Sequence, residues 1–137
     1  MFQEDPQALA AAEKASTIES GDYEAVITGV TVQQGRDGKA GSFVITWAIV
    51  DGDFEGCEYR QYLTLSAAAA GVRAAFYRNI GYVRPEDGAV DENDFIGKYG
   101  RPNLSNNDGS VKVNRVAKSS RQADEAAGGG SDADFGV

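Results

Sequence analysis

The order of secondary-structure patterns constrains the fold of this chain more than any other feature. Three strand-like segments rich in β-branched and aromatic residues come first, and one segment with helical spacing follows them. Two more short strand-like segments come next, joined by a turn rich in Asn, Asp and Gly. The strand-like segments cover residues 23–33, 43–50, 59–65, 98–104 and 110–117, and the helical segment covers residues 67–80.

Three strands, a helix and two strands are the layout of a five-stranded OB-fold barrel, with the helix between strands three and four. We therefore predict an all-β barrel with one inserted helix. The same order also fits an open α+β sheet, and this alternative is kept. A meander of three strands and a glycine inside the first of them, Gly29, favour the barrel.

Single residues refine these segments. Segment 43–50 is apolar on both faces apart from one threonine, which predicts a central strand. Ser66 is a suitable cap for the helix and Gly81 a suitable stop, while Pro102 indicates an edge or an irregularity in the fourth strand. The helical spacing rests on Val72, Ala75, Phe76 and Ile80.

The chain divides into a central domain and two arms. Residues 1–20 form an N-terminal arm, in which Asp5-Pro6 can start a short helix. Residues 21–121 form the domain that contains the strands. Residues 122–137 form a glycine-rich acidic tail, a kind of segment that reaches outward from a folded body. The tip of the tail is suited to docking on a partner and consists of Asp132, Asp134 and Phe135.

Missing residue types exclude several kinds of chemistry. Because Cys57 is the only cysteine, the chain cannot form an internal disulfide. Because there is no histidine, Ser-His and Cys-His nucleophile pairs and histidine metal sites are excluded. No apolar run approaches the roughly 20 residues that cross a bilayer. We therefore expect a cytoplasmic protein without a membrane segment, a cofactor, a metal or an enzymatic activity.

The net charge of −8 argues against a nucleic-acid partner until its distribution is considered. Residues 1–20 carry a net charge of −3, and residues 122–137 carry four acids and no base. Residues 21–121 contain twelve Lys and Arg against thirteen Asp and Glu. The domain is therefore nearly neutral, and most of the acidity lies in the arms.

Short motifs spread over residues 20–118 connect the chain to a known family. They are Gly21–Ile27, Gly41–Phe43, Trp47–Gly52, Phe54–Gly56, Leu63–Ser66, Phe95–Lys98 and Val113–Val116. With these motifs the chain resembles the small bacteriophage-encoded single-stranded DNA-binding proteins. The resemblance implies an OB-fold that protects exposed strands during DNA replication, recombination and repair in the host cytoplasm. The acidic tail resembles those of single-stranded DNA-binding proteins, which implies replication or recombination proteins as partners.

Binding of single strands requires aromatic platforms for the bases and cations along the phosphates. Arg60 and Tyr62 lie on the face of their strand opposite the leucines, so we expect them at the surface. Trp47 is a further stacking candidate, although large apolar neighbours on its face favour burial. The other candidates are Arg36 and Lys39 in the first turn, and Lys98, Tyr99, Arg101, Lys112 and Arg115 on the opposite wall. Lys112 and Arg115 are three positions apart, so in a strand their side chains point to opposite faces and at most one should face the groove.

A near-neutral domain predicts modest affinity for DNA with a shallow salt dependence, because few phosphates are contacted. If the tail competes with DNA for the groove, deletion of residues 122–137 should tighten binding. RNA stays open as a ligand, since nothing in the sequence reports on a 2′-hydroxyl contact. A homo-oligomer also stays open, because an edge strand or the N-terminal arm could pair subunits.

Two other function classes compete with DNA binding. A protein-interaction adaptor would use the same barrel to bind a peptide or another subunit, and it predicts no shift of a labelled oligonucleotide. A metal-dependent nuclease would need a rigid carboxylate site. Asp91, Glu92 and Asp94 lie together in an acidic loop without a matching carboxylate pattern on a strand, so a solvated loop is the preferred interpretation.

Overall fold

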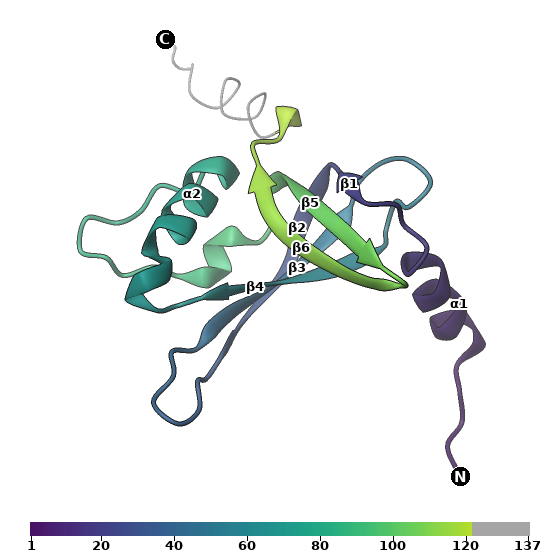
Figure 1. The fold of residues 1–137 in the computed structure, drawn as a ribbon. Coiled ribbons are helices and arrows are strands. Elements are labelled where there is room, and N and C mark those ends of the chain that lie inside the picture. Colours follow the sequence, from purple (N-terminus) through teal and green to yellow (C-terminus); the bar gives the residue numbers. More distant parts are fainter. Residues whose placement is uncertain (122–137) are drawn as a thin grey trace.

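A computed structural model of the protein describes residues 1–121 and has the architecture of an antiparallel sheet with two helices (Figure 1). The helices are α1 (Pro6–Ala15) and α2 (Ala70–Ile80), with short 3₁₀ turns η1 (Ala67–Ala69) and η2 (Glu92–Phe95). The strands are β1 (Gly21–Asp22), β2 (Ala25–Gln33), β3 (Ser42–Ile49), β4 (Glu58–Thr64), β5 (Tyr99–Asn107) and β6 (Ser110–Ala117).

The six strands form one sheet in the order β1-β5-β2-β3-β4, and β6 pairs with β5. Each ladder within residues 1–121 is antiparallel, and β3 is central between β2 and β4, as its apolar faces predict. Strands β4 and β6 approach each other, but no hydrogen-bonded ladder joins them in the described part of the chain. The sheet is therefore open, and the small domain has an α+β character.

Two irregularities bend the sheet at positions that the sequence indicates. The β2–β3 register shifts between Ile27 and Gly29, which leaves one extra residue on β2. The β5–β6 register shifts between Pro102 and Leu104. Pro102 cannot donate a backbone hydrogen bond, so it fits a point where a regular ladder is interrupted.

One face of the sheet packs on an aromatic cluster beneath α2. Phe95, which is fully buried, makes edge-to-face contacts with Phe43, Phe76 and Tyr82 at ring-centroid distances of 5.4, 5.6 and 5.0 Å. The neighbouring Ile96 is 47% exposed, so of this pair only Phe95 anchors the end of the acidic loop.

Helix α2 ends as predicted, but its start is exposed. The Ser66 hydroxyl caps the preceding 3₁₀ turn by accepting from the Ala69 amide, and Gly81 ends α2 in the left-handed conformation. Val72 belongs to the apolar spacing that predicts this helix, yet it is 61% exposed. The buried residues of α2 are Phe76, Tyr77 and Ile80 in its second half, and Val72 lies one turn before Phe76 at the exposed start of the helix.

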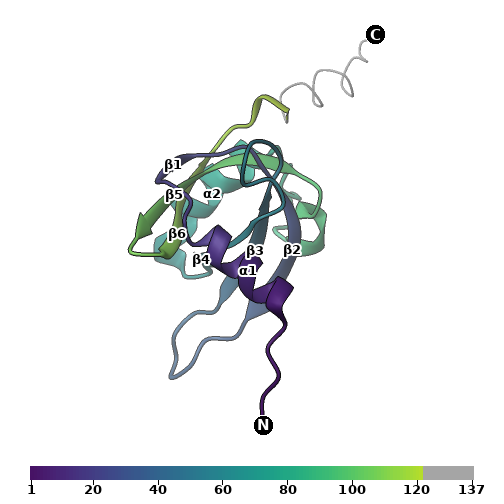
Figure 2. The same cartoon turned by 90° about the vertical axis from the view of Figure 1, so that its right-hand side faces the viewer.

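Helix α1 is held on the domain by its C-terminal end. It begins at the predicted cap, since the Asp5 carboxylate accepts from the Gln7 amide. The Tyr59 hydroxyl donates to the Ala15 carbonyl at 2.9 Å, and the Asn106 amide group donates to the carbonyls of Ser16 and Ile18. Figures 1 and 2 accordingly place α1 beside the β5–β6 turn. None of the helices within residues 1–121 is long and apolar enough to span a membrane.

Candidate nucleic-acid interface

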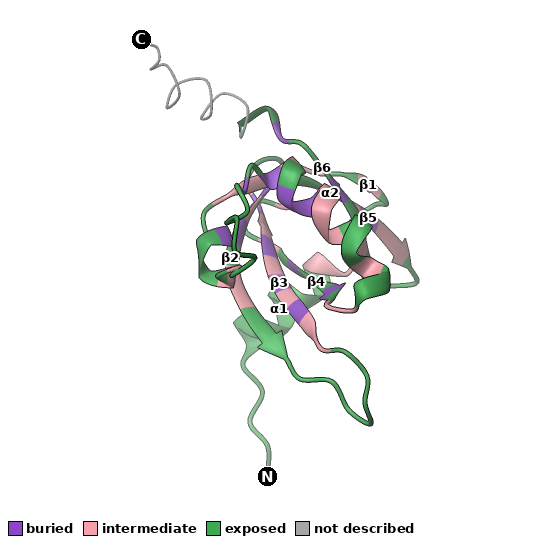
Figure 3. Cartoon of the chain, turned by 90° about the vertical axis from the view of Figure 1, so that its left-hand side faces the viewer, coloured by how far each residue is buried: buried purple, intermediate pink, exposed green. Residues whose placement is uncertain are grey.

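The outer face of strands β2, β3 and β4 carries the central candidate residues. Exposed and buried residues alternate along β4, which places Arg60 and Tyr62 outside and Tyr59, Gln61 and Leu63 inside. Figure 3 shows the corresponding alternation of buried and intermediate positions along β3. The period-2 pattern of the sequence therefore predicts the orientation of Arg60 and Tyr62 correctly.

The sheet register sets the neighbours of these two side chains. Tyr62 pairs with Val44, and Val44 pairs with Thr31 on β2. One row further along the face, Arg60 pairs with Thr46, and Thr46 pairs with Gly29. Directly paired residues of an antiparallel ladder share a face, so these two rows form one continuous surface.

This surface is hollowed into a groove of about 510 Å³. Its depth comes from small residues, because Gly29 leaves only a backbone surface beside Thr46. The groove is lined by Gly29, Val30, Thr31, Val32, Gln33, Val44, Thr46, Arg60 and Tyr62. The threonines, valines and glycine were not among the predicted site residues. Val44 and Thr46 alternate with the buried residues of β3, but only the sheet register places them beside Tyr62 and Arg60.

A second hollow of about 330 Å³ lies between β4 and β6. Arg60 and Tyr62 line it together with Val111, Lys112 and Val113. Arg60 and Tyr62 line both hollows and therefore form a ridge between them. The Tyr62 side chain is 59% exposed on this ridge, so its ring is accessible to planar groups that approach along the surface.

Arg36 and Lys39 are exposed residues of the β2–β3 hairpin and follow Val32 and Gln33, which line the end of the groove. Figure 1 shows this hairpin projecting from the sheet. The hairpin is closely built: a Cβ atom on Gly35 would lie 1.8 Å from the Lys39 carbonyl oxygen. Only glycine can occupy this position. The two cations are thus carried on a narrow extension of the β2–β3 side of the groove.

Residues of β5 lie at the far end of the same sheet face or outside it. Tyr99 pairs with Val26, which in turn pairs with Ala48 on β3, so the register places Tyr99 in the next row of the outer face. Lys98, which precedes it, is partly buried. Arg101 forms an ion pair with Glu24 at 3.0 Å. Arg101 is therefore less free to contact a phosphate than Lys112.

Lys112 and Arg115 of β6 line different hollows, as their three-residue spacing predicts. Lys112 lines the hollow next to Tyr62. Arg115 lines a different hollow of about 400 Å³ between β6 and α2, together with Val72 and Asn79. The groove side of β6 therefore has Lys112, and Arg115 points to the α2 side.

Trp47 must be removed from the set of candidate stacking residues. Its side chain is 0% exposed, and its indole Nε1 donates a hydrogen bond of 2.9 Å to Gln61 Oε1 in the core. Trp47 therefore lies beneath the groove face and supports it from inside. Strand β3 is apolar on both faces, so the sequence pattern could not exclude an exposed Trp47.

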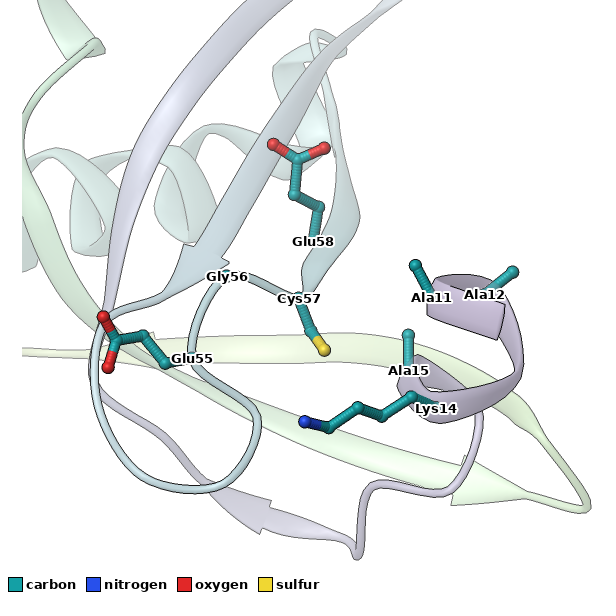
Figure 4. A pocket seen from close by; sticks show the side chains of 8 residues that line it. All are labelled: Ala11, Ala12, Lys14, Ala15, Glu55, Gly56, Cys57 and Glu58. Carbon is teal, nitrogen blue, oxygen red and sulfur yellow. The ribbon is translucent and has the colours of Figure 1, made fainter. Parts of the chain in front are cut away.

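Another hollow, of about 450 Å³, separates α1 from the β3–β4 loop (Figure 4). Cys57 points into it toward Ala15 and Lys14, and the Lys14 ammonium lies 5.9 Å from the centroid of Phe54. Burial raises the pKa of the nearby Tyr59, and Cys57 raises it further. No histidine is available to activate the thiol. We interpret this hollow as the seam along which α1 docks.

The acidic loop offers no metal site within residues 1–121, where no group of three or more Cys, Asp or Glu side chains could hold an ion. Asp91 instead caps η2 by accepting from the Asn93 amide. The predicted tail residues Asp132, Asp134 and Phe135 lie outside the described residues. No family model matches the chain, and no curated protein matches it either.

Proposed function

We propose that the protein binds single-stranded DNA without sequence preference in the groove on the outer face of β2, β3 and β4. It would protect exposed strands during phage DNA replication, recombination or repair and catalyse no reaction. The observation that carries this proposal is the Tyr62–Arg60 ridge, where an exposed ring and a guanidinium lie between two hollows. Stacking on an aromatic ring is tolerant of sequence because every base has a π-face.

The open sheet is compatible with an OB-fold, which we propose as the finer description. Strand β2 pairs with both β3 and β5, and β6 turns back toward β4, which is the strand arrangement of such a barrel before closure. Helix α2 lies between β4 and β5 in the sequence, at the position that this fold requires. The groove face and the β2–β3 loop are the regions where OB-folds bind oligonucleotides.

Fluorescence anisotropy of a labelled oligothymidylate tests the proposal. Tyr62→Ala should weaken binding roughly 5- to 150-fold, because stacking on one aromatic contributes about 1–3 kcal/mol per base. Tyr62→Phe should retain most of the affinity, and Val72→Ala, on the exposed face of α2, should leave it unchanged. Full binding by the Tyr62→Ala variant would contradict the proposed site. An RNA oligonucleotide of matched length shows which sugar is preferred.

A protein-interaction adaptor is the second candidate, and one observation favours it. The hollow between α2 and β6 has an exposed apolar residue, Val72, next to Ala75, Phe76 and Val116. An exposed apolar surface beside a groove is a common site for a protein partner. Absence of any oligonucleotide binding by the full chain would favour this function over DNA binding.

A further inference from the structure

A fifth surface hollow combines cations with an aromatic floor, and its lining shares no residue with that of the DNA groove. It has a volume of about 660 Å³, the largest among the hollows described in residues 1–121. It is enclosed by the first turns of α2, the end of β4 and the loop at residues 84–90. Phe43, Leu65, Tyr77 and Val90 supply apolar surface, and Arg73 and Arg84 supply charge.

Arg73 is fixed at the edge of this hollow. Its Nη1 atom donates to the carbonyl oxygens of Thr64 at 2.8 Å and of Ser66 at 2.6 Å. These two bonds hold the guanidinium group against the end of β4. Other N–H groups of the same guanidinium remain for a ligand. A preorganised guanidinium loses little conformational entropy when it binds a carboxylate.

Arg84 adds a second positive charge near the same point. Burial raises the pKa of the Tyr77 hydroxyl, and the charges of Arg73 and Arg84 both oppose this rise. Both guanidinium groups therefore act on one hydroxyl inside the hollow. Within residues 1–121 neither arginine has a carboxylate partner within ion-pair distance, although Glu86 lies on the rim.

The chain itself contains a segment of complementary chemistry. Residues 122–137 have four acids, no base and a single large apolar residue, Phe135. Asp134 is adjacent to Phe135, and Asp132 is three positions before it. Asp132 is eleven positions after Arg121, and an extended chain of eleven residues spans at most about 36–40 Å. A domain of 100 residues has a radius of gyration of about 13 Å, so the hollow is within reach.

We propose that the hollow beneath Arg73 and Arg84 binds the acidic segment Asp132–Phe135 of the same chain. Phe135 packs on the floor of Phe43 and Leu65, and the two aspartates face the guanidinium groups. The DNA groove is a poorer match for this segment. Its lining has one cation, Arg60, and one aromatic ring, Tyr62, beside threonine, valine and glycine, whereas the hollow has two arginines and two aromatic rings. This inference does not rest on DNA binding.

Paramagnetic relaxation in the full chain tests the contact without DNA. A nitroxide is attached to Ser131→Cys in a Cys57→Ser background, and backbone amide signals are measured by NMR. Signals of residues 65–90 should broaden, and the broadening should persist on dilution because the contact is intramolecular. Arg84→Glu should remove it, whereas Arg78→Glu, which alters an exposed arginine outside the hollow, should leave it in place.

Three results would overturn the proposal: broadening confined to β2, β3 and β4, no broadening at all, or broadening that disappears on dilution. Chemical-shift differences between the unlabelled chain and its Asp132→Asn/Asp134→Asn variant provide a second measurement if the labelled protein does not fold. They should concentrate at residues 65–90 and vanish in the Arg84→Glu background. Differences at the groove, or none, would contradict the contact. Failure of oligonucleotide binding would leave these readouts unaffected.

Discussion

The indole Nε1 of Trp47 donates a hydrogen bond of 2.9 Å to Oε1 of Gln61, and both side chains are buried. The two residues lie on adjacent strands, β3 and β4, and face the core directly below the groove. A buried polar pair of this kind is favourable only when both members are present, because an unpaired donor or acceptor keeps its full desolvation cost.

We therefore expect Gln61→Leu to lower the free energy of unfolding by about 1–3 kcal/mol, since it leaves the Trp47 N–H unsatisfied. Urea denaturation followed by circular dichroism measures this. Thr64→Val, on the exposed face of the same strand, serves as a control and should change stability by less than about 0.5 kcal/mol. A Trp47→Phe/Gln61→Leu double variant should lose less than the sum of the single changes. Additive losses would mean that the hydrogen bond contributes little.

Gly100 approaches the same tryptophan from β5. A Cβ atom on Gly100 would lie 2.7 Å from Trp47 Cη2 and 2.8 Å from Val116 Cγ1. Gly100→Ala should therefore destabilise the domain by about 1–3 kcal/mol through overpacking. Gly71 lies in α2 with open space around it, so Gly71→Ala should stabilise by about 0.5–1 kcal/mol through helix propensity. Thermal unfolding of the two variants measures both changes in stability. Equal effects of Gly100→Ala and Gly71→Ala would refute the overpacking of Trp47 by a side chain at position 100.

Local patterns predicted the parts of the site that depend on a single strand. The alternation along β4 places Arg60 and Tyr62 outside, and Gly29 marks the bulge that deepens the groove. These features follow from backbone geometry within a few residues, so neighbouring residues suffice to predict them.

Features that depend on tertiary packing were less predictable. Strand β3 has apolar residues on both faces, so its sequence could not decide whether Trp47 is covered. The spacing of Val72 from Phe76 fits the buried face of the helix, and only the packing of α2 in the folded chain shows that the start of the helix is exposed. The hollow at Arg73 and Arg84 joins residues from α2 and a distant loop, a proximity that appears only in the folded chain.

Lys112 and Arg115 offer a matched pair for the DNA interface. Lys112 lines the hollow beside Tyr62, whereas Arg115 faces α2. Lys112→Gln should weaken oligothymidylate binding and reduce the slope of log affinity against log salt by about 0.7, the loss of one phosphate contact. Arg115→Gln should leave both quantities unchanged. Anisotropy titrations at several salt concentrations measure the slopes, and an equal effect of the two substitutions would contradict a phosphate contact made by Lys112 and not by Arg115.

The anchoring of α1 should depend on alkaline pH. Burial raises the pKa of Tyr59 above the ordinary tyrosine value of 10.0, with Cys57 adding to the effect, and its hydroxyl donates to the Ala15 carbonyl. The folded state therefore keeps this proton to a higher pH than the unfolded state does. The resulting stability is fully present below pH 10 and is lost as the pH rises from there toward the folded pKa.

Tyr59→Phe should consequently flatten the fall of unfolding free energy above about pH 10 and cost about 1 kcal/mol at neutral pH through the lost hydrogen bond. Some slope should remain, because burial also raises the pKa of Tyr77. Urea denaturation between about pH 7 and pH 11 gives the two curves. If the variant and the parent chain fall in parallel, Tyr59 does not couple the docking of α1 to pH.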